Sequence, residues 1–308
     1  MRTSYLIQRN IKMFFKDKGF VLTSLITPLI LILLYVTFLK NVYVDSFNSA
    51  LEQTGITISE NYINGFVYGW LFSSLLAVSG VTVSFCSNLL MVQDKVTGAI
   101  RDLEIAPVKR TKIAVAYYVA SMSVSMVIVL IEAIVGFLII AGTGWFLSVG
   151  DVLKILLGVF LLVNFGTALS SIIHHFLTTQ GQMSAVGTIV SSVYGFICGA
   201  YMPISQFGSG LQKILSLLPG TYATVFIRDG YERGVLNKLV SECNFPQEVV
   251  DNMASTFDVS ISFFGHNVPS WACGLILGLA TLLCLGIYIL LNVKKNKKLS
   301  SKKMKNAM

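Results

Sequence analysis

The sequence predicts an all-α, polytopic membrane protein with six transmembrane helices, and three observations lead to that fold class. Of the 308 residues, 54% are hydrophobic and only 12% are charged, whereas soluble domains carry about 25% charged residues. The apolar residues form runs long enough to cross a hydrocarbon core of about 30 Å. Most basic residues lie outside these runs, in a one-sided arrangement. This composition excludes a soluble globular domain.

Six apolar runs are expected to span the membrane. They cover residues 21–39, 66–86, 113–141, 152–173, 183–202 and 271–293. Together they form a transmembrane domain over 21–293, preceded by an interfacial helix at 1–20 and followed by a basic tail at 294–308. If six spans alternate, 17 of the 23 basic residues lie on one side. The positive-inside rule makes that side the cytoplasm, which predicts a multi-pass protein of the cell membrane with both termini inside.

The N-terminal stretch has the pattern of an amphipathic helix lying in the membrane surface. Apolar side chains recur at helical spacing over Ile7–Phe15, while Arg9, Lys12 and Lys16 take another face. The basic face is expected to meet lipid phosphates. The helix either only anchors the chain or also contacts a cytoplasmic partner.

A second amphipathic helix is predicted in the cytoplasmic loop between spans two and three. Its apolar residues recur every three or four positions, at Leu89, Val92, Val96, Ile100 and Leu103. The polar residues Asp94, Thr97 and Arg101 face elsewhere, and Pro107 ends the helix because proline lacks an N–H and clashes with the preceding turn. One continuous, rigid helix of this kind gives a protein outside the membrane a site that it can bind and through which it can move the membrane helices. The alternative is a passive interfacial helix.

The external segment, residues 203–270, begins with a short amphipathic stretch at Leu211–Leu218, which Pro219 and Gly220 end. This stretch is too short to cross the membrane, so it either re-enters the membrane or lies at its surface. The remainder, residues 234–269, is polar and is expected to form a small external cap.

Two stretches resemble a known family. The run Gln93–Arg110, QDKVTGAIRDLEIAPVKR, resembles the coupling-helix region of type-2 ABC exporter permeases. In that region an acidic residue precedes a small residue and glycine, followed by leucine, by threonine-proline and by a basic residue. The stretch Gly199–Ile204, followed by Leu218-Pro219 and Arg228, is similar to the exit of the family's fifth span and its external re-entrant helices. The six-span order and the N-terminal interfacial helix are similar too.

The resemblance implies the permease subunit of an ABC exporter, in which two permease copies form the translocation path. The second copy is either the same chain or a similar permease, and membrane lipids rather than nucleic acid are the partners expected for the net charge of +8. A separate cytoplasmic ATPase, expected in two copies, binds ATP and Mg²⁺ and drives transport. The sequence contains no G-x-x-x-x-G-K-[ST] loop, so it is not expected to be an enzyme or to hold a cofactor of its own. The cargo, whether drug, peptide, lipid or polysaccharide, stays open.

The residues expected to have a role fall into three groups. One group, the candidates for a cavity or gate, is Glu132 and Arg228. Coupling to the ATPase is assigned to Asp94, Thr97, Gly98, Arg101, Leu103 and Pro107. Dimer or pathway packing is assigned to the small residues Gly187, Ser191, Gly195 and Gly199 of span five and Ser73 and Ser74 of span two. Small residues let helix backbones approach closely, although packing within one subunit is the alternative for each. The family pattern is broken at Asp94, where glutamate is usual, and at Ala106, where threonine is usual.

Glu132 is a charged residue well inside a span, where a central charge costs about 2.5–3.5 kcal/mol. Its carboxyl either bonds a hydroxyl such as Ser73 or Ser74, or faces the cavity, or pairs with Arg228 at an outer gate. Glu132 also supports the alternative function, an ion- or proton-coupled secondary transporter, although such proteins usually carry several embedded charges. A third class, a membrane enzyme or scaffold, lacks a cluster of catalytic side chains. The five cysteines show no spacing typical of a metal site or a disulfide framework.

Overall fold

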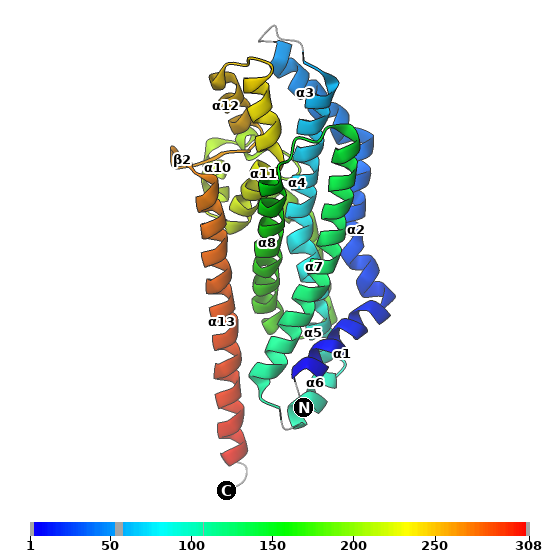
Figure 1. The fold of residues 1–308 in the computed structure, drawn as a ribbon. Coiled ribbons are helices and arrows are strands. Elements are labelled where there is room, and N and C mark those ends of the chain that lie inside the picture. Colours follow the sequence, from blue (N-terminus) through cyan, green and yellow to red (C-terminus); the bar gives the residue numbers. More distant parts are fainter. Residues whose placement is uncertain (1–2, 53–57, 107, 306–308) are drawn as a thin grey trace.

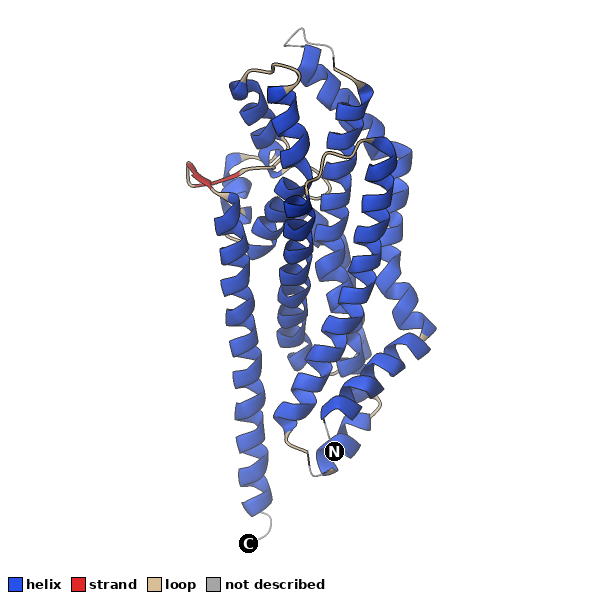
Figure 2. Cartoon of the chain, viewed as in Figure 1, coloured by secondary structure: helices blue, strands red, loops and turns tan. Residues whose placement is uncertain are grey.

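The computed structural model describes residues 3–52, 58–106 and 108–305, which form a bundle of helices with one short β-hairpin (Figures 1 and 2). The α-helices are α1 Thr3–Lys16, α2 Lys18–Leu34, α3 Lys40–Glu52, α4 Glu60–Ser87, α5 Leu89–Val96, α6 Ala99–Ile105, α7 Arg110–Thr143, α8 Val149–Phe176, α9 Gln180–Ile197, α10 Ser209–Leu215, α11 Pro219–Ser241, α12 Gln247–Thr256 and α13 Ser270–Lys305. The remaining elements are the π-helix η1 Tyr35–Leu39, the 3₁₀-helix η2 Ile204–Gln206 and the antiparallel strands β1 Ile261–Phe263 and β2 His266–Val268.

Five helical stretches are long and apolar enough to cross a membrane, which confirms a polytopic membrane protein. They are Lys18–Ser49, Glu60–Val96, Arg110–Thr143, Val149–Phe176 and Ser270–Lys294. Each contains one predicted span and extends beyond it at both ends. Inside hydrocarbon every backbone N–H and C=O needs an internal partner, and a continuous helix supplies these partners.

The predicted fifth span corresponds to α9, which has 18 residues and is not among the five. α9 ends at Ile197 rather than at Met202. Gly199 has a φ of 70°, in the left-handed region, and the N–H of Ala200 returns to the Gly195 carbonyl at 2.9 Å. A glycine in this conformation commonly ends a helix. The prediction that Gly199 lies within the span is therefore wrong.

α4 forms the centre of the bundle, and every residue from Gly69 to Ser87 is buried. It packs against α7, α8 and α11, and against α2 on a further side (Figure 1). The α4 and α8 backbones approach closely, because a Cβ on Gly166 would lie 2.9 Å from the Gly80 carbonyl oxygen. Only a residue without a side chain permits such an approach.

The segment between α9 and α13 contains α11, which lies against the bundle, and a small cap. α11 begins at Pro219, where proline fits the first helical turn, and packs against α4, α8 and α13. The shorter α10 exposes Leu211 and Ile214. The cap contains α12 and the short β1–β2 hairpin. The other elements of the described residues are helices, which confirms the all-α prediction. The hairpin turns at Phe264 and Gly265, whose φ angles are 47° and 89°.

The two ends of the bundle carry different elements (Figure 1). α1, α6 and the C-terminal end of α13 lie at one end, which we call the α1 end. α12 lies at the opposite end, the α12 end. Both described chain ends are therefore on the same side of the bundle.

Candidate functional site

At the α1 end, the predicted cytoplasmic helix consists of two helices rather than one. α5 ends at Val96 and α6 begins at Ala99, because Gly98 has a φ of 83° and breaks the helix between them. L-residues other than glycine rarely adopt this conformation. A Cβ on Gly98 would meet no described atom within 4 Å, so the turn faces open space. The prediction of one continuous helix is wrong.

The residues assigned to coupling divide between exposed and buried positions. Thr97 and Arg101 are exposed, and Leu103 is half-buried. Asp94, predicted on the outward polar face, is buried instead, with 1% of its surface exposed. Pro107 lies outside the described residues. The roles of the exposed residues in coupling remain predictions.

Asp94 is held by side chains from two other helices. Arg9 on α1 donates two hydrogen bonds to its carboxylate, at 2.5 and 3.1 Å, and Tyr117 on α7 donates a third. A bidentate arginine–carboxylate pair is among the stronger polar contacts in proteins, and hydrogen bonding to Asp94 raises the pKa of Arg9. The prediction that Arg9 faces lipid phosphates is wrong, because it ties α1 to α5.

Lys95, the next residue of α5, is fixed to the end of α8. Its Nζ donates to the carbonyl oxygens of His174, His175 and Leu177, at 2.7, 2.9 and 3.0 Å. The last carbonyls of a helix lack intrahelical donors and carry partial negative charge, so a lysine there is stabilising. Two consecutive residues thus link α5 to α1, α7 and α8.

A groove of about 560 Å³ lies between α2, the α4–α5 junction and α9. Its α2 wall includes Thr23 and Thr27, and its α9 wall includes Ser184, Thr188 and Ser192. These hydroxyls place polar groups on a mostly apolar surface that lies among the helices of the bundle. The volume falls in the range of about 300–1,000 Å³ that small-molecule sites occupy.

The small residues predicted to pack along span five have different surroundings. Gly187 and Ser191 line the groove, and a Cβ on Gly187 would meet no described atom within 4 Å. Gly195 lies under Tyr201 of its own chain, whose ring comes within 2.2 Å of an added Cβ. The Tyr201 hydroxyl also donates to the Ser191 carbonyl at 3.4 Å. At Gly195 the structure therefore shows packing within one subunit.

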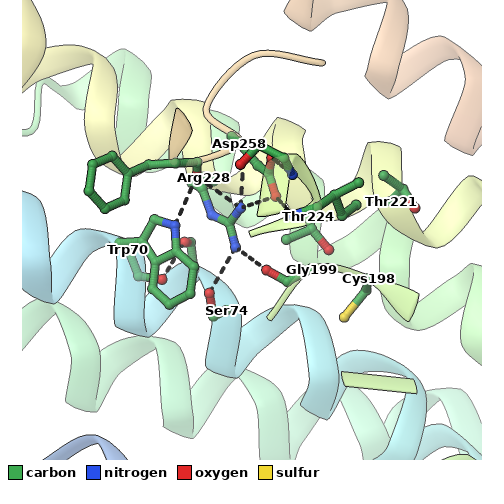
Figure 3. A network of polar contacts seen from close by, with 12 residues as sticks. Trp70, Ser74, Cys198, Gly199, Thr221, Thr224, Arg228 and Asp258 are labelled. Atoms are coloured by element: carbon green, nitrogen blue, oxygen red, sulfur yellow. Dashed lines mark hydrogen bonds and ion pairs between the residues drawn. The ribbon is translucent and has the colours of Figure 1, made fainter. Parts of the chain in front are cut away.

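At the α12 end, Arg228 on α11 is fully buried in a polar network (Figure 3). Its Nη2 donates to the Ser74 hydroxyl and to the Gly199 carbonyl, both at 2.9 Å. Its Nη1 donates to the carbonyl oxygens of Phe257 and Asp258, at 3.2 and 3.3 Å. The guanidinium thus joins α4, the exit from α9 and the cap.

Asp258 supplies the countercharge in this network. Its Oδ2 lies 3.8 Å from Nη1 of Arg228, and its carboxylate accepts hydrogen bonds from the backbone N–H groups of Ile204 and Ser205. Burial raises the pKa of Asp258 to about 6 despite these partners. Trp70 covers the Arg228 guanidinium, with 4.6 Å between Cζ and the ring centroid. These contacts are suited to holding α4, the exit from α9 and the cap in a fixed arrangement.

Glu132 on α7 is buried, and neither carboxyl oxygen has a hydrogen-bond partner among the described residues. The Ser79 hydroxyl of α4 is likewise unpaired within that part of the chain. The predicted partners Ser73 and Ser74 bond elsewhere. The predicted pairing of Glu132 with Arg228 is also wrong, because the network described above engages the guanidinium. Glu132 is not among the residues that line the groove.

Sequence reasoning missed three charged residues that the structure brings into contact with others. Asp258 lies in a polar loop and is 30 positions from Arg228, so no local pattern connects them. In the sequence, Lys95 is distinguished only as one of the basic residues on the predicted cytoplasmic side. Glu232 on α11 is fully buried, and an added Cβ on Gly69 would lie 2.6 Å from its Oε1. In the sequence, Gly65, Gly69 and Ser73 recur every four residues, a spacing typical of close helix contacts, but it does not identify Glu232 as the partner.

Metal ligands do not gather in the described ranges. No group of three or more His, Cys, Asp or Glu residues within them could hold a metal ion. The five cysteines are free, and three of them are buried. The polar groups described above are therefore those of the groove, of the two ion-pair networks around Asp94 and Arg228, and of the buried carboxyls.

One protein family matches most of the chain. The family described as ABC-2 type transporter matches residues 1–231, which include the groove, the Thr97-Gly98 turn and Arg228. Members of this family are membrane permeases without a nucleotide-binding domain. No curated protein matches the chain.

Proposed function

The chain belongs to the ABC-2 type transporter family and is a membrane permease component of an ABC transporter; on this premise we propose that it is the permease subunit of an exporter that works as a dimer. The family lacks a nucleotide-binding domain, so a partner ATPase binds ATP and Mg²⁺. Because the chain belongs to this family, we do not retain the alternative function, a secondary transporter that uses Glu132.

The groove between α2 and α9 is the observation that supports this proposal most directly. Hydroxyl groups are expensive to expose to hydrocarbon unless they are bonded or meet water. Ser192 is exposed on α9 and lines the groove, whereas the exposed hydroxyl of Thr188 is satisfied by the Ser184 carbonyl at 3.0 Å. One subunit supplies such a surface on one side only, so a second permease copy is needed to enclose a path.

Exposed apolar side chains lie along α2 and α9, the two helices that form the walls of the groove, and offer a surface for that second copy. They are Leu22, Ile26, Leu29 and Leu33 on α2 and Ile189, Val193 and Phe196 on α9. The exposed leucines of α13, such as Leu275 and Leu279, lie on a helix that contributes no residue to the groove. We therefore assign the α2–α9 face to the subunit interface and the α13 face to lipid.

The open turn at Thr97 and Gly98 is the proposed contact with the ATPase. Arg101 lies exposed one turn further along α6. Asp94 and Lys95 anchor α5 to α1, α7 and α8, so a push on the turn moves several helices together. Asp94 accordingly holds the coupling element in place and does not touch the ATPase.

The α1 end is assigned to the cytoplasm, because the basic clusters before α2 and between α5 and α7 lie there. α9 is proposed as the sixth span, since 18 residues rise about 27 Å, close to the hydrocarbon thickness. α10 and α11 would then re-enter from the external side. α12 and the hairpin would form the external cap.

Site-specific photo-crosslinking tests the dimer. A photoreactive amino acid replaces Ser192 on the α9 wall in one experiment and Leu279 on α13 in the matched control. Both positions are exposed, so neither replacement disturbs the core. Two differently tagged copies are expressed together, with and without the ATPase, and irradiated in membranes.

The Ser192 probe is expected to join two permease copies, or this chain to a similar permease, and the Leu279 probe to join neither. Crosslinks at Leu279 without crosslinks at Ser192 would place the interface on the opposite side and refute the proposal. Co-purification of a cytoplasmic ATPase with the untreated protein tests the energy source separately.

A further inference from the structure

The cap at the α12 end contains a pocket of about 500 Å³. It lies between η2, α10, α12 and the β-hairpin, outside the five long apolar stretches. Its volume suits a small molecule. The pocket shares no lining residue with the groove, so binding there does not depend on the proposed transport function.

The hydroxyl donors on the helical walls of the pocket are already used. Ser205, Ser216 and Ser255 each donate to a backbone carbonyl, at 2.6, 2.9 and 2.9 Å. A serine hydroxyl has one proton to donate and two lone pairs. Each of these serines therefore offers a ligand only acceptor lone pairs.

The other polar groups on these walls are also acceptors. The Gln212 amide donates both of its protons, to the carbonyl oxygens of Ser205 and Phe207 at 2.9 and 2.7 Å, which leaves its Oε1. Asp251 accepts one hydrogen bond from Gln247 and keeps lone pairs on its second oxygen. Lysine and arginine are absent from the described lining residues. The pocket is thus rich in acceptors and carries negative charge.

We infer that this pocket binds a small organic cation with N–H donors, of the class of primary amines and diamines. An ammonium group has three donors and no acceptor, which complements the helical walls, whose side-chain donors are used. The hairpin side of the lining adds the side chains of Ser260, Ser262 and Asn267, which can both donate and accept. Anions are disfavoured by Asp251. A metal ion is disfavoured because Asp258, the other carboxylate of the lining, is paired with Arg228, and the described ranges hold no metal-binding group.

Calorimetric titration of the detergent-purified full chain tests the site with two dications of the same chain length. Putrescine carries ammonium N–H donors, whereas its permethylated analogue, with a quaternary ammonium at each end, carries the same charge without any donor. Titrations are run at about 0.15 M salt, which screens distant charges. Putrescine is expected to bind saturably at one site per chain, and the permethylated analogue to bind at least about tenfold more weakly because it cannot donate hydrogen bonds.

Two variants and a matched control test whether putrescine binds in the pocket. Asp251→Asn is expected to weaken putrescine at least about tenfold, since a charge-assisted hydrogen bond is lost. Glu248→Gln is the matched control, because Glu248 is an exposed carboxylate on the same helix that does not line the pocket. Ser262→Lys, at an exposed lining position, adds a fixed cation and should abolish binding even if Asp251→Asn folds poorly.

Three results would overturn the inference. They are equal binding of putrescine and its permethylated analogue, equal losses in Asp251→Asn and Glu248→Gln, and undiminished binding in Ser262→Lys. Tighter binding of Mg²⁺ than of putrescine would also overturn it, because the pocket would then take an inorganic cation.

Discussion

Arg9 on α1 and Asp94 on α5 form a bidentate ion pair across 85 positions of sequence. The Asp94 side chain is 2% exposed and the Arg9 side chain 27%, so the pair is largely withdrawn from water. It makes the N-terminal helix part of the element that carries the Thr97-Gly98 turn. A movement of α5 must therefore take α1 with it.

Asp94→Asn tests this pair, because it keeps the side-chain shape and leaves the Arg9 charge without its partner. Hydrogen bonds to charged groups contribute about 1.5–3 kcal/mol, so we expect the free energy of unfolding to fall by about 2 kcal/mol. Denaturant unfolding in detergent measures the loss. Lys12→Gln, an exposed charge on the same helix, should have little effect. Fully additive losses in a double-mutant cycle with Arg9→Gln would contradict the pair.

The sequence predicts the long helices well, because a run of apolar residues long enough for the bilayer has few other ways to satisfy its backbone. Prediction from the sequence fails where a single residue interrupts a periodic pattern of apolar residues. The apolar stripe continues past Gly98 at helical spacing, yet the positive φ of that glycine divides the helix. Periodicity places Asp94 opposite the stripe, but α1 docks there and buries it. The Arg228–Asp258 network joins segments whose meeting depends on the whole fold.

Gly98 allows a separation of backbone strain from contact with the ATPase. Gly98→Asn tolerates a positive φ, whereas Gly98→Ala should cost about 1–2 kcal/mol of stability. Gly98→Trp adds bulk where the permease itself has open space. We expect Gly98→Trp to lose ATPase co-purification and substrate-stimulated ATP hydrolysis, and Gly98→Asn to retain both. Normal coupling in folded Gly98→Trp protein would remove the turn from the coupling contact.

Gly195 and Tyr201 form a steric pair whose two partners are testable together. A Cβ at position 195 would lie 2.2 Å from the Tyr201 ring, and overpacking of this kind costs about 1–3 kcal/mol. Gly195→Ala should lower thermal stability, and Tyr201→Ala in the same chain should make the combined loss smaller than the sum. Gly187→Ala is the matched control, since its Cβ meets no described atom. Alanine is the better helix former, so an equal loss at Gly187 would show that contact with the Tyr201 ring does not decide the effect.

Glu132 is expected to be dispensable for transport, because it is buried against α4 and does not line the groove. Its carboxyl oxygens lack partners among the described residues, and a charged group there costs about 2.5–3.5 kcal/mol. Glu132→Gln should therefore assemble and transport normally, and Glu132→Leu should be at least as stable as the natural protein. Ser79→Ala, on the facing helix, is the companion variant. Transport loss in well-assembled Glu132→Gln would instead give the carboxyl a direct role.

Asp258 should make the stability of the cap depend on pH. Burial raises its pKa from an ordinary value of 3.8 to about 6, so the folded state holds the proton more tightly than the unfolded chain does. Its contribution to stability is then complete below about pH 3.8 and is lost as the pH rises through about 6, with an upper limit of about 3 kcal/mol. Thermal unfolding from pH 5 to 7.5 should therefore show falling stability in the natural protein and a flatter profile in Asp258→Asn. Asp251→Asn, an exposed carboxylate of the same cap, should keep the natural slope. Identical slopes in the natural protein and Asp258→Asn would mean that Arg228 and the Ile204 and Ser205 N–H groups stabilise the carboxylate enough to offset its burial.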